Sequence, residues 1–268
     1  VRKGIPLKGL NAVQHQAGLD LLHTALSDSG FNKATSLMQL ETILKEIENR
    51  GADDDHRDPE KYFISIFGNP AGDSIWAWRF EGHHVAFNFS SKNNRLISAT
   101  PGFLGSNPAI VLSGPEKGKQ ILKDESDLGF ALLHALDTKQ MERALISVTA
   151  PAEILTGDSR KAMISDQKGI RYDELSREQQ KLFMQLLAIY IHRYTRLFAM
   201  EMMHDIESAG LNNIRFAWAG DQQPGPVPAI GEEGREDEHQ EQRLAGPHRM
   251  VDDPAGWDEG EEDGCPER

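Results

Sequence analysis

Two adjacent histidines, His83 and His84, are the residues of this chain best suited to chemistry. Imidazole can act as a general acid or base near neutral pH, and it is a common ligand of transition metals. The pair follows Glu81-Gly82, which lies between two runs rich in aromatic and β-branched residues. A Gly-containing pair in that setting predicts a β-hairpin with a two-residue turn. We therefore expect any catalytic or metal site to lie at this hairpin.

The hairpin also predicts where each imidazole points. A turn at Glu81-Gly82 places Phe80 opposite His83 and Arg79 opposite His84, and residues that lie opposite one another share a face of the sheet. His83 would then lie on an aromatic core face and His84 on the more polar face. An undistorted strand cannot aim both imidazoles at one metal ion, although a β-bulge beside the turn could redirect one of them.

A structural role is the other interpretation of the same pair. His83 would then be a half-buried, hydrogen-bonded residue at the end of the aromatic face, with His84 beside Arg79. Both interpretations stay open on the residues alone.

Four charged residues are candidates for a supporting role. Arg79 and Glu81 flank the histidines and could orient a substrate or a metal ligand. The polar turn at residues 156–160 offers the Asp158 carboxylate and the Arg160 guanidinium together, although an ordinary turn is the simpler interpretation.

Other polar patterns favour structure over chemistry. His192 and His204 belong to a mostly apolar helical pattern, which favours core packing. The acidic run at residues 53–55 has neither the spacing nor the glycine of a calcium loop. The chain contains no phosphate-binding loop, nucleophile elbow, zinc-protease helix or dinucleotide fingerprint.

Composition limits the class of protein. The chain has 268 residues and a net charge of −13, which argues against a nucleic-acid surface. Residues 221–268 contain 15 Asp and Glu against 4 Lys and Arg, so most of this charge belongs to the end of the chain. That segment is also rich in Gly and Pro, and we expect it to be a disordered acidic tail.

Cysteine and hydropathy add further limits. The only cysteine is Cys265, so we expect no disulfide and no zinc–cysteine site. No apolar run is long enough for a membrane span. We expect a soluble protein, and the residues leave open whether it is cytoplasmic or exported.

Periodicity predicts an α+β fold in which an antiparallel β-meander packs against helices. Connections this short cannot form parallel crossovers. The longest helix is expected to begin at the capping-box sequence Ser176-Arg177-Glu178-Gln179. The expected helices cover residues 11–28 (ended by Gly30), 33–49, 126–136, 140–146 (capped by Asp137 or Thr138) and 177–208. The expected strands cover residues 61–67, the hairpin, 95–100, 109–112 and 213–219.

Several segments together resemble one bacterial family, the domain of unknown function 3500. They are Tyr62 to Gly68, Trp78 to His84, Thr100 to Pro108, Leu155 to Arg160 and Phe216 to Gly220. The resemblance covers roughly residues 1–220, which we expect to form a single domain. It implies no established activity.

The resemblance also implies more sequence before Val1, and a further strand with a His-x-His segment after Gly220. Residues 221–268 stand in that place, as a genuine tail or through a shifted reading frame. If the family has a metal site, its ligands would be His83 and His84 with the distal histidine pair, which suits a divalent transition metal.

Two functions follow as expectations. The first is a metal-dependent enzyme, a hydrolase or an oxidoreductase, with His83 or His84 as ligand. The second is a non-catalytic binding or structural module in which both histidines are structural. The small-molecule or protein partner of either one is not specified by the residues.

Overall fold

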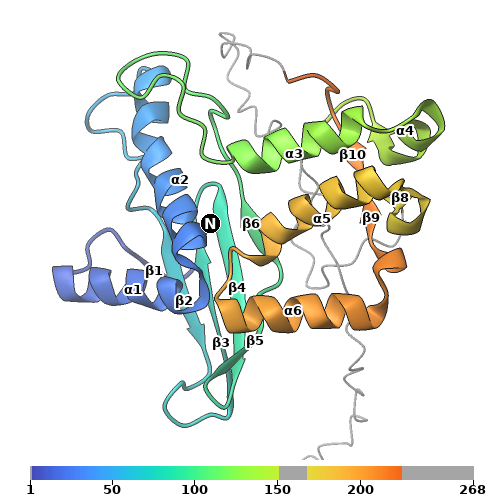
Figure 1. The fold of residues 1–268 in the computed structure, drawn as a ribbon. Coiled ribbons are helices and arrows are strands. Elements are labelled where there is room, and N and C mark those ends of the chain that lie inside the picture. The colour runs from blue at the N-terminus through green and yellow to red at the C-terminus, as the bar shows by residue number, and fades with distance from the viewer. Residues whose placement is uncertain (1, 151–167, 225–268) are drawn as a thin grey trace, which may run out of the picture.

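The computed structural model describes residues 2–150 and 168–224, and it shows the α+β fold that the sequence predicts (Figure 1). Its elements, in chain order, are β1 (Ile5–Pro6), α1 (Ala12–Ala25), α2 (Asp28–Ile47), β2 (Phe63–Phe67), β3 (Ile75–Glu81), β4 (Val85–Lys92), β5 (Arg95–Ser98), β6 (Gly102–Leu104), α3 (Lys123–His134), α4 (Thr138–Ala144), β7 (Leu145–Ser147), β8 (Ile170–Arg171), α5 (Arg177–Ile191), α6 (Arg196–Ala209), β9 (Arg215–Phe216) and β10 (Trp218–Ala219). None of the helices within these two ranges is long and apolar enough to cross a lipid bilayer.

The main sheet has six strands, and every pair in it is antiparallel. The order is β1-β2-β3-β4-β5, and β6 pairs with the other end of β4. Alternate residues of β3 and β4 are buried, as expected when one face of a sheet covers a core. That face packs against α1, α2 and the beginning of α6, in a cluster that includes Trp78, Phe80, Phe87, Phe89, Leu22, Leu37, Tyr194 and Phe198.

A second hydrophobic cluster lies among α3, α5, α6 and the short strands β7 to β10. It includes Leu132, Phe183, Ile206 and Trp218. Met202 of α6 contacts both clusters. In the view of Figure 1, α1 and α2 are drawn at the left, and α3, α5 and α6 at the right. A single domain over residues 1–220 stays a prediction.

The second helix begins earlier than the periodicity predicts. The expected start at residue 33 and the expected stop at Gly30 are both wrong, because α2 begins at Asp28 and contains Gly30 in its first turn. Ser27 caps the helix by accepting a hydrogen bond from the Gly30 backbone N–H, at 3.1 Å. Gly30 allows the backbone of α2 to approach the backbone of Arg193 closely, since a methyl group on its Cα would overlap the carbonyl oxygen of Arg193.

The helix expected over residues 177–208 is divided in two. The capping box at Ser176 begins α5 as predicted, but the helix ends at Ile191 and α6 begins at Arg196. Between them, the backbone bonds with the α1–α2 junction: Ser27 N donates to Arg193 O at 2.9 Å, and Thr195 N donates to Ala25 O at 3.0 Å. These tertiary hydrogen bonds take the place of helical ones, so helical periodicity alone could not reveal the break.

Two smaller expectations also change, and one open alternative is decided. The strand predicted over residues 109–112 is wrong, and a strand lies instead at β6, before that segment. The strand predicted over residues 213–219 is two strands, because β9 pairs with β8 and β10 pairs in parallel with β7. Asp137 is the cap of α4. The predicted tail lies almost entirely outside the described residues.

We expect the substitution Gly30→Ala to destabilise the protein. An alanine inside a helix usually adds stability, but here its methyl group would force α2 away from Arg193. Overpacking of this kind costs about 1–3 kcal/mol, measured as a lower free energy of unfolding in urea. Gly51→Ala is the matched control, because nothing lies within 4 Å of the added methyl group. Equal stabilities of the two variants would contradict the close approach.

Candidate functional site

The hairpin turns at the histidines themselves. Phe80 lies opposite Phe87 and Glu81 opposite Ala86, and Gly82 N donates to Val85 O at 2.8 Å. The predicted turn at Glu81-Gly82 is therefore wrong, and the true partner of Phe80 lies four residues further along. The faces are preserved because the shift is even. The longer pairing brings aromatic residues together, as when Trp78 lies 4.2 Å from Phe89 between ring centroids.

Both imidazoles lie together at the turn, and the expected opposite orientation is wrong. Their ring centroids are 3.4 Å apart. His84 has a φ of 64°, a left-handed conformation that is uncommon for residues other than glycine. This conformation reverses the direction of the chain. The carbonyl oxygen of His84 accepts a hydrogen bond from Gly105 N, at 2.7 Å.

Tyr62 contacts the turn through both its hydroxyl group and its ring. Its hydroxyl donates to His83 O at 2.6 Å. Its ring lies against Gly82, where any side chain would overlap it. The glycine is therefore needed for this contact, and the tyrosine fixes the backbone that carries His83.

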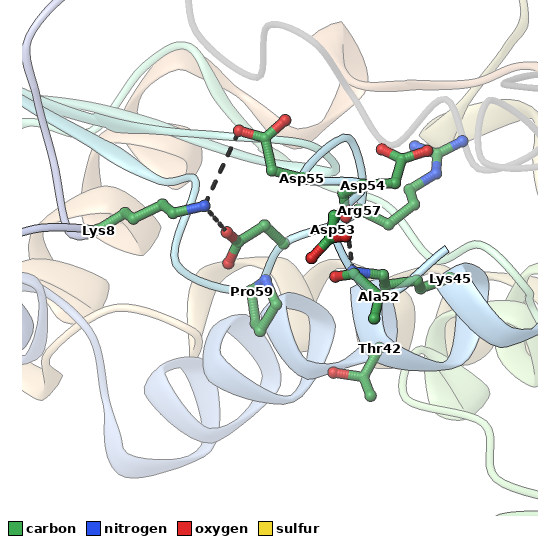
Figure 2. A pocket seen from close by; sticks show the side chains of 10 residues that line it. Lys8, Thr42, Lys45, Ala52, Asp53, Asp54, Asp55, Arg57 and Pro59 are labelled. Atoms are coloured by element: carbon green, nitrogen blue, oxygen red, sulfur yellow. Dashed lines mark hydrogen bonds and ion pairs between the residues drawn. The ribbon is translucent and has the colours of Figure 1, made fainter. Parts of the chain in front are cut away.

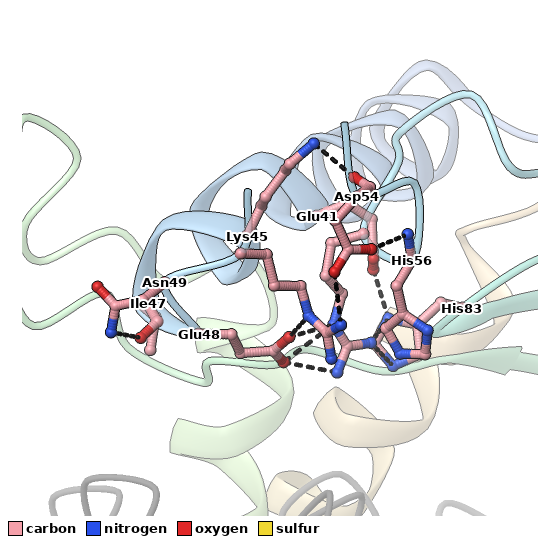
Figure 3. Close-up of polar contacts among 10 residues, drawn as sticks. Glu41, Lys45, Ile47, Glu48, Asn49, Asp54, His56 and His83 are labelled. Atoms are coloured by element: carbon pink, nitrogen blue, oxygen red, sulfur yellow. Dashed lines mark hydrogen bonds and ion pairs between the residues drawn. The ribbon is translucent and has the colours of Figure 1, made fainter. Parts of the chain in front are cut away.

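A buried carboxylate orients the imidazole of His83. Glu41 of α2 is only 2% exposed, and its Oε1 lies in hydrogen-bonding contact with His83 Nδ1 (Figure 3). Since a carboxylate accepts hydrogen bonds, Nδ1 carries the proton and Nε2 is left as the base. This pair is the arrangement found behind catalytic and metal-bound histidines.

Arg57 lies against the same ring, and its Nη1 is 3.4 Å from His83 Nδ1. Its Nη1 is 3.3 Å from His83 Nε2, and the guanidinium is held by Glu48 at the end of α2 through Nη2, at 2.7 Å from Oε1. Arg57 is 4% exposed, so the cation is buried beside the base. Burial alone would raise the pKa of Glu48, but hydrogen bonds from Arg57 and Arg50 bring it below its ordinary value.

The environment keeps His83 neutral. Burial is the largest influence and lowers the pKa of His83 below its ordinary 6.5, because a charged imidazole loses hydration there. The hydrogen bond with Glu41 opposes this, while His84 and Arg57 lower the pKa further. A neutral, oriented imidazole can accept a proton at physiological pH.

An open polar pocket of about 490 Å³ leads to this network (Figure 2). Arg57 lines it and therefore connects it to His83. Its wall is formed by Lys8, Lys45 and the polar loop that follows α2, including residues 53–55. The acidic run at residues 53–55, which lacks the pattern of a calcium loop, thus borders the pocket.

The structure brings only some of the predicted residues together. Arg79 and Glu81 form an ion pair with one another, at 3.3 Å, and Arg79 lies over the ring of Phe67. They have no ion pair of their own with the histidines among the ion pairs of the described residues. Asp158 and Arg160 lie outside the described residues, so their proposed supporting role stays a prediction.

Sequence reasoning missed Glu41, Glu48 and Arg57. One signal could have found Glu41, because it lies on the apolar stripe of α2 between Leu37 and Leu44. A charged residue on a core-facing stripe is rarely buried without a partner. Nothing local marks Arg57, since its loop is polar throughout.

Residues 1–228 match the family described as "Protein of unknown function (DUF3500)". The chain belongs to the DUF3500 family. The resemblance noted in the hairpin and in the final strands is confirmed. No curated protein and no solved structure matches this DUF3500 chain. The function must therefore be argued from the site itself.

The lowered pKa of His83 makes stability depend on pH. The unfolded chain binds the His83 proton near pH 6.5, but the folded chain binds it only at lower pH. Stability from this residue is therefore present above pH 6.5 and is lost as the pH falls through the folded pKa. We expect the free energy of unfolding to decrease from about pH 7.5 to about pH 5, and to decrease less in His83→Gln.

Denaturant unfolding at several pH values measures this effect. The carboxylates with lowered pKa values, such as Glu48 and Asp54, titrate at more acidic pH and would not mask it. Identical slopes for wild type and His83→Gln would show that burial does not perturb His83.

Proposed function

We propose that the protein is an enzyme, of the hydrolase class, whose general base is His83. The observation that carries this proposal is the contact between His83 and the buried carboxylate of Glu41. The carboxylate holds the ring by Nδ1 and would stabilise the imidazolium that forms when Nε2 takes a proton from water or from a hydroxyl group. The lowered pKa supports the same role, since the ring is unprotonated at neutral pH.

Arg57 would stabilise the negative charge that develops during the reaction. Its guanidinium lies beside Nε2 and also lines the open pocket. A substrate in the pocket would contact the Arg57 cation, and His83 lies directly behind that cation. A fixed positive charge next to an oriented base suits a reaction that passes through an oxyanion. We therefore expect a small, polar substrate.

A metal-dependent hydrolase or oxidoreductase is the second candidate. The carboxylate behind His83 and the contact between the two imidazoles favour it. Within residues 2–150 and 168–224, however, no group of three or more His, Cys, Asp or Glu side chains is placed to hold a metal ion. His83 and His84 supply two ligands, so this version needs further ligands from elsewhere. The cation of Arg57 also disfavours a second positive charge.

The general-base role predicts a specific loss of activity. We expect wild-type protein to hydrolyse members of a panel of activated carboxylic and phosphoric esters. His83→Asn should lower kcat/KM by about 10²–10⁴-fold, which is typical for loss of an acid–base group. Glu41→Gln should cause a smaller loss and shift the acidic limb of the pH–rate profile. The limb in wild type should lie below pH 6.5, because the pKa of His83 is lowered.

His23→Asn is the matched control, because His23 also contacts a carboxylate, that of Asp28, but lies exposed on α1. It should leave kcat/KM unchanged. Equal activity in His83→Asn and wild type would overturn the proposal, as would a folded wild type that hydrolyses none of the esters. The latter result would favour a non-catalytic binding or structural module.

Metal analysis separates the two catalytic versions. Inductively coupled plasma mass spectrometry of the purified chain should find no stoichiometric zinc, copper or iron if His83 acts as a free base. A stoichiometric metal that is lost in both His83→Asn and His84→Asn, but kept in His23→Asn, would establish the metal-dependent version instead.

A further inference from the structure

A second buried polar cluster lies where α2 and α3 meet the α5–α6 junction. It contains Lys33, Glu125, Tyr190 and Arg193. Glu125 is 2% exposed and Arg193 is 7% exposed. Both are charged residues that are rarely buried to this degree without a full set of partners. The cluster is separate from His83, since Lys33 and Glu41 are eight residues apart on α2, or about 12 Å along the helix.

Glu125 has one satisfied oxygen and one unsatisfied oxygen. Its Oε1 accepts from Lys33 Nζ at 2.7 Å. Its Oε2 is buried, and no hydrogen-bond donor reaches it within the described part of the chain. A carboxylate oxygen in this state is costly, because it has lost water and gained no donor. A ligand at this position would need an N–H or O–H group that donates a hydrogen bond to Glu125 Oε2.

Arg193 presents the opposite requirement. Its guanidinium lies over the ring of Tyr190, 4.6 Å from the centroid, and the described contacts give it no carboxylate partner. Guanidinium groups offer five donors in a planar fork that suits carboxylate and phosphate oxygens. A ligand at this position would need an anionic oxygen that accepts hydrogen bonds from the Arg193 guanidinium.

The backbone holds Arg193 in this place. Its carbonyl accepts from Ser27 N, and Gly30 lies directly against it. Glu125 and Arg193 also act on the same phenol: burial raises the pKa of Tyr190, with Glu125 raising it further and Arg193 lowering it. Arg193 lies over the Tyr190 ring, and the charge of Glu125 acts on the same phenol, so the two charged groups belong to one cluster.

We propose that Glu125 and Arg193 bind a small organic acid that also carries a hydrogen-bond donor, as an amino acid or a hydroxy acid does. The acid group faces the Arg193 guanidinium, and the amino or hydroxyl group donates to Glu125 Oε2. Lys33 and Arg193 together exceed the charge of Glu125 by one, which matches an anionic group. Lys33 and Tyr190 are half-buried and mark the side from which the ligand enters.

Four probes of similar size test both requirements at once. Glycine and glycolate each carry a carboxylate and a donor, acetate carries only the carboxylate, and methylamine carries only the donor. We expect glycine or glycolate to raise the Tm of the full chain by several degrees at a concentration where acetate and methylamine have little effect. Isothermal titration calorimetry with the same probes gives the affinities, and the better of the two acids distinguishes an amino acid from a hydroxy acid.

Two variants assign the effect to the site. Arg193→Gln should abolish the shift for every acid, whereas Arg196→Gln, at an exposed arginine in the first turn of α6, should leave it unchanged. Glu125→Gln keeps an acceptor for Lys33 but places an amide donor where Oε2 was. It should therefore weaken glycine or glycolate by about tenfold and improve acetate.

The reversal between glycine and acetate is specific to a donor requirement at Glu125, so a merely destabilised variant would not produce it. The proposal is overturned if none of the four probes shifts the wild-type Tm or releases heat. It is also overturned if Arg193→Gln or Glu125→Gln binds the probes as wild type does. Neither result bears on the role of His83.

Discussion

The interlock between the α1–α2 junction and the α5–α6 junction is the constraint on which the rest of the structure depends. Leu26 and Tyr194 form an isolated antiparallel bridge, which is made by the hydrogen bonds of Ser27 N and Thr195 N. Ser27 Oγ also donates to His192 O at 2.7 Å. Two segments more than 160 residues apart are thus joined backbone to backbone. These junctions tolerate little displacement, because their backbone N–H and C=O groups have no helical hydrogen bonds to replace the ones between the junctions.

The interlock also joins the two hydrophobic clusters. Tyr194 leaves the helical path at this point and its ring packs edge-on against Phe87 and Phe89 of the sheet. The helix α5, which ends just before Tyr194, belongs to the second cluster. The position of α2 follows from the contacts of Ser27 and Gly30 with the α5–α6 junction. The break in the expected long helix is therefore what lets one chain build both cores.

Most local features of the fold could be predicted from the sequence, because they depend on neighbouring residues. The capping box at Ser176, the aromatic face of the hairpin and the α+β class follow from caps, alternation and short connections. The helix break, the start of α2 and the turn at His83 could not be predicted. Each depends on a contact with a distant segment: Arg193 for α2, Leu26 for the break, and Tyr62 for the turn.

The candidate site was predictable only in part for the same reason. The adjacent histidines are visible in the sequence, but the group that gives His83 its orientation lies 42 residues away on α2. Burying charged groups such as Glu41 and Arg57 rarely adds stability, since apolar residues of similar volume often serve as well. Their presence beside an imidazole is therefore better explained by what they do to that imidazole than by the needs of the fold.

The helix α2 carries charged groups of both the His83 site and the second cluster. At 100° per residue, Lys33, Glu41 and the C-cap residue Glu48 lie within an arc of about 80°, on the apolar stripe that also carries Leu37 and Leu44. Lys33 reaches Glu125, Glu41 reaches His83, and Glu48 reaches Arg57. A purely structural helix would fill such a stripe with apolar residues. Because the interlock at Ser27 sets the rotation of α2 about its axis, the same few backbone hydrogen bonds place the polar groups of both sites.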